Sequence, residues 1–405
     1  MAVFGGTLKC VIGNAAALLK GLPIEDREYL SFRESLGRIC LVFFTSLYTV
    51  ETIKMIIIPV LRDHLTWTWL DLCINYQAGF VRRGLLGEIL FQLQPIIPSF
   101  VVAAVFIFCA YLLFTHLVIK FVKYTPLLVF LFFIFSPGSL LFPICADSAF
   151  GRKEIFALCA FALALLTYTK VLACKWKVCI FLVLYTIATL IHECALFFAP
   201  LAACLLIYST DTHNKRFRTY LLCVLYVYFI LLSCLLILTI NHNFDQSRIA
   251  LSWSPYFPNI HPNAYMMYLN KGLEDVLAET KQNAINFNTF TGPFLIDFCL
   301  AVLPIILLLL HTTHVEFFRT LRKNEPFLFF STIVSLLIPF FLFCFQDWGR
   351  WIYLIAVQTF LFLIMLNNFG LVAYRRISPI TGDQWRIYIV FLLYYAILWG
   401  MPHIR

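Results

Sequence analysis

Arginine pairs, carboxylates and a histidine recur in short polar segments between the long apolar runs of this 405-residue chain. Arg82 and Arg83 stand between glycines in the segment 62–90, and the segment CADSAFGRKE (145–154) contains Asp147, Arg152 and Lys153. Arginine presents a planar fork of donors that matches phosphate oxygens, and glycine permits close approach of the backbone to a ligand. Both segments therefore predict binding of an anion such as a phosphate group.

Other polar segments contain side chains that could accept a proton from a hydroxyl group. Asp71 follows two tryptophans in the segment 62–90, and His192 and Glu193 are adjacent in HECAL, which lacks the second histidine of the HExxH zinc motif. The segment FQDWGRWIY (345–353) places Asp347 three residues before Arg350. Tryptophans beside a carboxylate are also typical of sugar binding, so this segment could hold a sugar ring.

The candidate site combines these segments. The candidate catalytic residues are Asp71, Asp347, His192 and Glu193, and the candidate substrate-binding residues are Arg82, Arg83, Asp147, Arg152, Lys153, Arg350, Trp348 and Trp351. No metal ligands are assigned. Each segment also has a structural interpretation, such as an arginine pair on lipid head groups, a polar pair between two half-helices, or an i,i+3 salt bridge. The stronger argument for function is that all these segments are predicted on one face of the membrane.

Composition determines the fold class. The chain is 62% hydrophobic and 13% charged, whereas soluble proteins average about 25% charged residues. Apolar runs near the length that crosses a bilayer recur throughout. The sequence predicts an all-α integral membrane protein, a polytopic bundle of about 11 transmembrane helices with a long amphipathic first outer loop. The predicted spans are 39–60, 97–119, 125–145, 155–169, 178–191, 194–208, 219–240, 292–311, 326–345, 352–367 and 387–400.

The topology depends on whether residues 178–208 form one span or two. A single span would bury His192 and Glu193 at its centre, where an ionised group costs about 2.5–3.5 kcal/mol. Two spans also concentrate the lysines and arginines in the loops of one side, as the positive-inside rule expects. We therefore predict two short segments. The predicted organisation is a cytoplasmic N-terminal segment at 1–35, then a single polytopic membrane domain at 36–405 with large outer loops at 62–96 and 241–291.

The arrangement resembles the multi-spanning glycosyltransferases and polymerases of envelope polysaccharide synthesis, both the GT-C-type enzymes and the O-antigen polymerase-type proteins (the Wzy and EpsG-like group). The resemblance lies in the topology across most of the chain. It implies that an acidic residue of the first outer loop acts in catalysis and that arginines bind lipid-linked phosphate. The matching residues are Asp63 or Asp71, and Arg82, Arg83, Arg152 and Arg350. No adjacent carboxylate pair stands in that loop, so a divalent metal cofactor is left open.

These features predict a membrane glycosyltransferase or polysaccharide polymerase that uses a polyprenyl-phosphate-linked sugar donor at the extracytoplasmic face of a bacterial inner membrane. Asp71 or Asp347 would take the proton. The expected partners are the lipid-linked saccharide, membrane lipids and other glycan-assembly membrane proteins. The net charge of +9 lies in short loops, so no nucleic acid is expected. The alternatives are a transporter or flippase, which usually places its polar site at the midplane, and a non-catalytic scaffold.

Overall fold

The computed structural model describes residues 24–146, 149–210, 215–240, 245–260, 291–326, 329–335, 348–374 and 382–397, with residues 278 and 282. Its regular elements are helices, apart from an isolated bridge between Thr312 and Tyr374. Five helices are long and apolar enough to cross a membrane: Ser31–Leu61, Ser99–Val122, Cys174–Ile191, Thr219–Leu238 and Gly349–Asn368. The all-α fold is therefore confirmed, and the number of about 11 spans stays a prediction.

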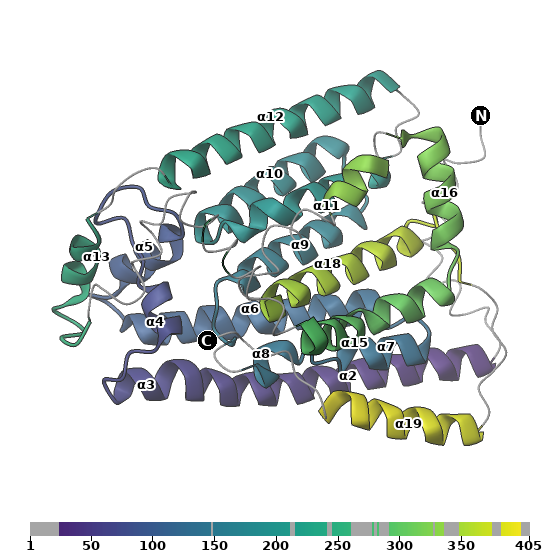
Figure 1. Ribbon diagram of the computed structural model, residues 1–405, viewed down its shortest axis with the longest axis horizontal. Helices are drawn as coiled ribbons and strands as arrows, with labels where there is room; N and C mark the ends of the chain where they lie inside the picture. Colours follow the sequence, from purple (N-terminus) through teal and green to yellow (C-terminus); the bar gives the residue numbers. More distant parts are fainter. Residues whose placement is uncertain are drawn as a thin grey trace.

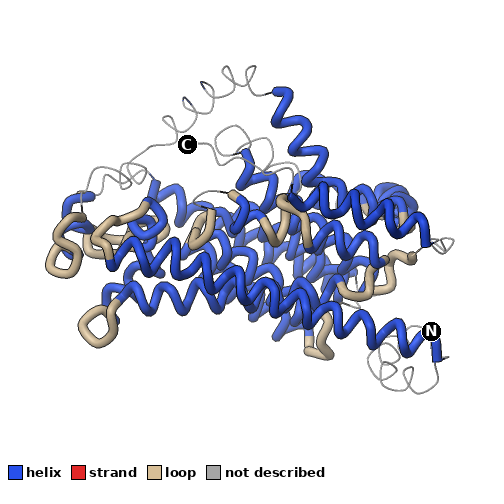
Figure 2. The backbone as a smooth tube through the Cα atoms, turned by 90° about the horizontal axis from the view of Figure 1, so that it is seen from below, coloured by secondary structure: helices blue, strands red, loops and turns tan. Residues whose placement is uncertain are grey.

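Most helices run along one long axis (Figure 1), and the loops gather at the two ends of the bundle (Figure 2). The helices along this axis are α2 (Ile24–Thr52), α6 (Ser99–Val122), α7 (Leu127–Ile134), α9 (Glu154–Tyr168), α10 (Cys174–Ile191), α11 (Cys194–Ser209), α12 (Lys215–Ile240), α15 (Thr291–Leu310), α18 (Trp348–Asn368) and α19 (Gly382–Ile397). Large apolar side chains face outward on this bundle. For example, Leu231 and Leu238 of α12 are 65% and 71% exposed, as expected of side chains that face lipid.

The first helix is longer than the predicted span at 39–60. It begins at Ile24 and continues through the π-helix η1 (Ile53–Ile57) into α3 (Ile58–Leu61). Because Pro59 has no backbone N–H, the carbonyl group four residues before it lacks its usual helical donor, and the turn widens there. The early start shows that charged residues near position 30 extend the helix beyond its apolar part.

The predicted span 125–145 is wrong as a continuous helix. The structure has α7 (Leu127–Ile134), a non-helical stretch, and the short α8 (Phe142–Cys145). Pro137 and Gly138 explain the break, because both residues disfavour a helix interior. Local serines and one distant tyrosine satisfy backbone groups at the break. The Ser139 hydroxyl donates to the carbonyl group of Phe133, the N–H of Gly138 donates to Ser136, and Tyr48 donates to the carbonyl group of Leu140. The hydroxyl group of Ser136 also lies 2.8 Å from that of Tyr395.

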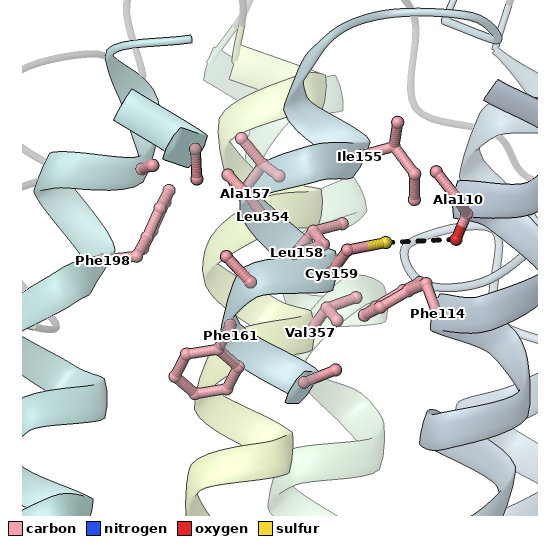
Figure 3. Packing of buried hydrophobic residues seen from close by; sticks show 14 of the residues in the cluster. Ala110, Phe114, Ile155, Ala157, Leu158, Cys159, Phe161, Phe198, Leu354 and Val357 are labelled. Atoms are coloured by element: carbon pink, nitrogen blue, oxygen red, sulfur yellow. Dashed lines mark hydrogen bonds between the residues drawn. The ribbon is translucent and has the colours of Figure 1, made fainter. Parts of the chain in front are cut away.

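Helix α9 lies at the centre of the bundle, between α6, α10, α11 and α18. Its alanines at 157, 160, 162 and 164 are buried and allow the neighbouring helices to approach closely. Figure 3 shows Cys159 of α9, whose thiol donates to the main-chain carbonyl group of Ala110 in α6 at 3.1 Å. Val357 and Leu354 of α18 complete this layer. These contacts fix the height of α9 relative to α6.

Parts of the two large predicted outer loops pack on each other at one end of the bundle (Figure 1). The first contains α4 (Trp67–Leu72) and α5 (Gly84–Leu93), and the second contains α13 (Gln246–Trp253). Trp253 is fully buried, and its indole N–H donates to the carbonyl group of Cys73 at 2.7 Å. Asn75 donates to Ser252 at 2.9 Å. We call residues 62–96 and 245–260 together the cap.

Candidate functional site

Arg83 occupies a tight turn of the cap. Its backbone is left-handed (φ 63°), and it directly precedes α5. Gly84 and Gly87 make the turn possible: a Cβ on Gly87 would lie 1.9 Å from the carbonyl oxygen of Ile74, and one on Gly84 would lie 2.3 Å from the ring of Tyr76. The glycines therefore hold α5 close to the preceding chain, and this packing points Arg83 toward the bundle.

The Arg83 guanidinium forms a bidentate pair with Glu193, with its Nε 2.8 Å from Oε2 and its Nη2 2.5 Å from Oε1. Asp71 lies on the other side of Arg83, with Oδ1 at 3.8 Å from Nη1. Although burial alone would lower the pKa of Arg83, the carboxylate of Glu193 raises it overall. Burial alone would likewise raise the pKa of Glu193, and Arg83 holds it well below its usual value. Both groups are therefore charged at neutral pH.

Lys153 lies beside this pair and is completely buried. Its ammonium group donates to the main-chain carbonyl group of Arg83 at 2.7 Å. Burial lowers the pKa of Lys153, while Asp71 acts in the opposite direction. Lys153 was expected to bind substrate, but its position shows that it supports the Arg83 turn from within the protein.

Glu154 is the next member of the network. Its Oε1 accepts from Nη1 of Arg350 at 2.6 Å and lies 3.4 Å from Nε2 of His192. The Nδ1 of His192 accepts from the backbone N–H of Cys194 at 3.1 Å, so we assign the ring proton to Nε2, facing Glu154. Burial, followed by the charge of Arg83, lowers the pKa of His192 to about 4. His192 is therefore neutral and orients Glu154.

We call these seven residues the charged cluster: Asp71, Arg83, Lys153, Glu154, His192, Glu193 and Arg350. Within it, three cations match three carboxylates. Arg82, half-buried beside Arg83, and Arg152, which precedes Lys153, add two positive charges. Helices α5, α9 and α11 all begin at or next to cluster residues. Because each helix N-terminus carries partial positive charge, the described part of this region has an excess of positive potential.

The part of the charged cluster at the start of α9 is recessed relative to the start of α6. Helices α6 and α9 both run away from the cap, and Cys159 lies level with Ala110. With a rise of 1.5 Å per residue, Ala110 lies about 16 Å along α6 and Cys159 about 8 Å along α9. The start of α9 therefore lies about 9 Å below the start of α6. Glu154 and the cluster residues beside it therefore lie deeper in the bundle than the start of α6.

A small pocket of about 20 Å³, room for about one water molecule, adjoins the cluster. Its polar lining comes from Arg152, Glu154 and Arg350, and its other walls include the aromatic rings of Tyr111 and Tyr353. Tyr353 stacks on Phe142 with ring centroids 4.6 Å apart. The pocket therefore presents two guanidinium groups and one carboxylate against aromatic walls.

The structure brings together seven of the twelve predicted site residues in the cluster itself or in the pocket lining: Asp71, Arg83, Arg152, Lys153, His192, Glu193 and Arg350. Arg82 lies at the edge of the cluster. Burial lowers the pKa of Arg82, and the nearby charge of Glu193 acts in the opposite direction. Asp147, Asp347 and the side chain of Trp348 lie outside the described residues. Trp351 is buried and packs against Phe197 and Phe198, so it does not line the pocket expected to hold a sugar ring.

The sequence interpretation missed Glu154, Tyr111 and Tyr353 as site residues. A carboxylate at the first position of a helix is common because it favours the helix dipole, so Glu154 gave no separate signal. The two tyrosines lie within apolar runs and resemble core residues. Only their shared position beside Arg152 and Arg350 identifies them.

Among the residues that the structure describes, no three His, Cys, Asp or Glu side chains are grouped to hold a metal ion. No family model, no curated protein and no solved structure matches this chain. The charged cluster and the pocket beside it are therefore the features of the described structure that bear on function.

Proposed function

We propose that this chain is a membrane glycosyltransferase or polysaccharide polymerase that transfers a sugar from a polyprenyl-phosphate-linked donor at the extracytoplasmic face of a bacterial inner membrane. The observation that supports the proposal is the meeting of Arg152, Glu154 and Arg350 in one pocket beside the charged cluster, where helices α5, α9 and α11 begin. A lipid-linked phosphate has the charge that this potential favours, and its lipid part keeps it in the bilayer.

The residues of the pocket fit the roles that glycosyl transfer requires. The acceptor hydroxyl oxygen forms a bond to the anomeric carbon while the bond from that carbon to the phosphate oxygen breaks. Glu154 is the carboxylate that lines the described pocket. Although burial alone would raise the pKa of Glu154, Arg350 holds it well below its usual value, so the group is ionised but a weak base. We assign it the hydroxyl proton at the stage when Arg350 turns to the departing phosphate. Arg152 and Arg350 stabilise the negative charge that develops on the departing lipid phosphate. Asp71, expected to be the base, instead lies against Arg83.

The other cluster members would position these groups. Neutral His192 orients Glu154, and the pair of Arg83 with Glu193 connects the cap to the start of α11. The recess below the cap limits access of water, which would otherwise hydrolyse the donor. Tyr111 and Tyr353 close the apolar side of the pocket, and each stacks on a phenylalanine ring behind it.

The proposal is tested with Arg152→Gln and Glu154→Gln in the source organism lacking its own copy of the gene. Arg152 is half-exposed, so its truncation should leave folding intact. We expect each variant to shorten or abolish the surface glycan, with a loss of about 10²-fold or more in transfer by purified protein supplied with polyprenyl-phosphate-linked sugar. Protein abundance in the membrane is measured in parallel.

Arg248→Gln is the matched control, because Arg248 is an exposed arginine of the cap whose carboxylate partner is Asp245, within its own helix turn. It should support normal glycan length. Normal glycan and normal transfer in both the Arg152 and the Glu154 variant would overturn the proposal.

Transport of a lipid-linked or small polar substrate is the second candidate. It is favoured by the interruption between α7 and α8 and by the recessed cluster, since transporters often place broken helices around a site inside the membrane. Proteoliposomes with fluorescent polyprenyl-phosphate sugar separate the two functions. Movement of the label across the bilayer without any new glycosidic bond would favour transport and contradict transfer.

A further inference from the structure

Helix α16 (His314–Asn324) lies across the end of the bundle opposite the cap, whereas the neighbouring helices run along the bundle axis (Figure 1). It follows α15 directly, and the bridge between Thr312 and Tyr374 fixes its beginning. A helix in this orientation runs parallel to the plane of a bilayer that the bundle crosses.

One face of α16 packs onto the bundle. His314 is fully buried, and its Nε2 lies 2.8 Å from the carbonyl oxygen of Leu363 in α18. Phe317 contacts the ring of Tyr208 at the end of α11, and Leu321 is buried. The spacing of these residues is that of one helix face. The helix is therefore fixed in orientation and cannot roll freely.

The opposite face of α16 is basic and exposed. Arg319, Arg322 and Lys323 all lie on the exposed side, with Glu316 as the acidic residue of the helix. Lys170 and Lys175 are also exposed. Their segment lies at the same end of the bundle, because the nearby Lys177 donates to the carbonyl group of Ser209, next to Tyr208. The positive charge therefore extends beyond the helix itself.

Exposed aromatic side chains lie near α16, at the same end of the bundle. Trp176 is 56% exposed and Tyr374 is 41% exposed, and both belong to segments that adjoin α16. Tryptophan and tyrosine are enriched where a membrane meets water. Basic side chains at the same height as an aromatic belt lie level with lipid head groups.

We propose that the basic face of α16 binds the head groups of anionic phospholipids in the leaflet at this end of the bundle. The orientation, the fixed inner face and the positive charge together fit a negatively charged lipid surface rather than a neutral one. This site is separate from the charged cluster, so the proposal is independent of the proposed catalytic function.

The test uses the full-length protein in nanodiscs of phosphatidylcholine, with and without phosphatidylglycerol. We expect phosphatidylglycerol to raise the midpoint of thermal unfolding of the unaltered protein and the shift to shrink at high salt. The double variant Arg319→Ser/Arg322→Ser should lose most of that shift. Each protein is compared with its own unfolding midpoint in phosphatidylcholine. A general loss of stability in the variant would therefore not reduce the shift caused by phosphatidylglycerol.

The control is Arg62→Ser/Arg248→Ser, which removes two exposed arginines from the cap. It should keep the full shift. The same shift in the α16 variant and in the control would overturn the proposal. An equal stabilisation of the unaltered protein by soluble glycerol phosphate would also overturn it, because the ligand would then be a free anion rather than a lipid surface.

Discussion

The buried ammonium group of Lys153 donates a hydrogen bond to the carbonyl group of Arg83, whose backbone is left-handed. A left-handed backbone at a residue other than glycine costs about 1–3 kcal/mol and persists only where neighbours hold it. Lys153 supplies one such contact, and the close packing at Gly87 supplies another. The result is that the Arg83 side chain reaches Glu193, which is far away in the sequence.

Substitution of Lys153 by methionine tests this support. Lys153→Met should lower the free energy of unfolding by about 1–3 kcal/mol, because the carbonyl group of Arg83 loses its donor in a buried position. Denaturation of the detergent-solubilised protein measures the change. Lys170→Met, at an exposed position, serves as control and should have little effect. Equal stability of the two variants would contradict the structural role of Lys153.

The Arg83–Glu193 pair can be measured by a double-mutant cycle with Arg83→Gln and Glu193→Gln. Each single change removes the main partner of a partly buried charge, so each should destabilise the protein by about 1–3 kcal/mol. The double variant should be less damaging than the sum of the two, with a coupling energy of about 1–3 kcal/mol. Strictly additive effects would show that the two side chains do not interact.

The pKa of His192 predicts a pH dependence of stability. Burial, with Arg83 second, holds this pKa at about 4, below the usual 6.5. As the pH falls, the unfolded chain therefore takes up the proton first. The contribution of neutral His192 is complete above about pH 6.5 and is lost as the pH falls toward 4. Thermal unfolding between pH 7 and pH 4 should show this loss.

His192→Gln should flatten that part of the profile, since glutamine does not titrate. His64→Gln, at an exposed position of the cap, should leave the profile unchanged. A profile with the same slope in the unaltered protein and in His192→Gln would exclude His192 as the source.

Gly87 tests the packing of the cap. In Gly87→Ala the new methyl group would meet the backbone oxygen of Ile74 at 1.9 Å, so α5 must move away from the chain beside it. We expect a loss of about 1–3 kcal/mol in stability and a disturbed position of Arg83. Gly37→Ala is the comparison, because its methyl group would meet only a side-chain carbon of Ile119 at 3.1 Å. Similar abundance and melting of both variants would argue against the tight contact.

The division of residues 178–208 into two helices was predictable, because placing an ionised group in lipid is costly. His192 and Glu193 indicated a chain reversal, and the structure has α10 and α11 on either side of these two residues. The break at Pro137 and Gly138 was missed, because an apolar run of the right length looks like a span whether or not its backbone is continuous. Backbone groups at the break bond to nearby serines and to Tyr48 of α2, and no local pattern reveals the contact with Tyr48.

The site was predictable in its residue types but not in its pairing. Arg83, Glu193 and Arg350 stood out because charges are rare in such an apolar chain. Which arginine would meet which carboxylate depends on the packing of distant helices, and the sequence contains no signal for that. The fully buried position of Lys153 and the role of Glu154 could only follow from the packed bundle.

The short α9 and α11 have an electrical consequence. If the start of α6 marks the surface of the bilayer, the pocket lies about 9 Å into roughly 30 Å of hydrocarbon, or about a third of the way across. A transmembrane potential of about 100 mV then does about 0.7 kcal/mol of work on each elementary charge that enters. With the cap on the outer side, as proposed, a negative cell interior would oppose the entry of an anion from the cap, and occupancy of the pocket would then depend on voltage.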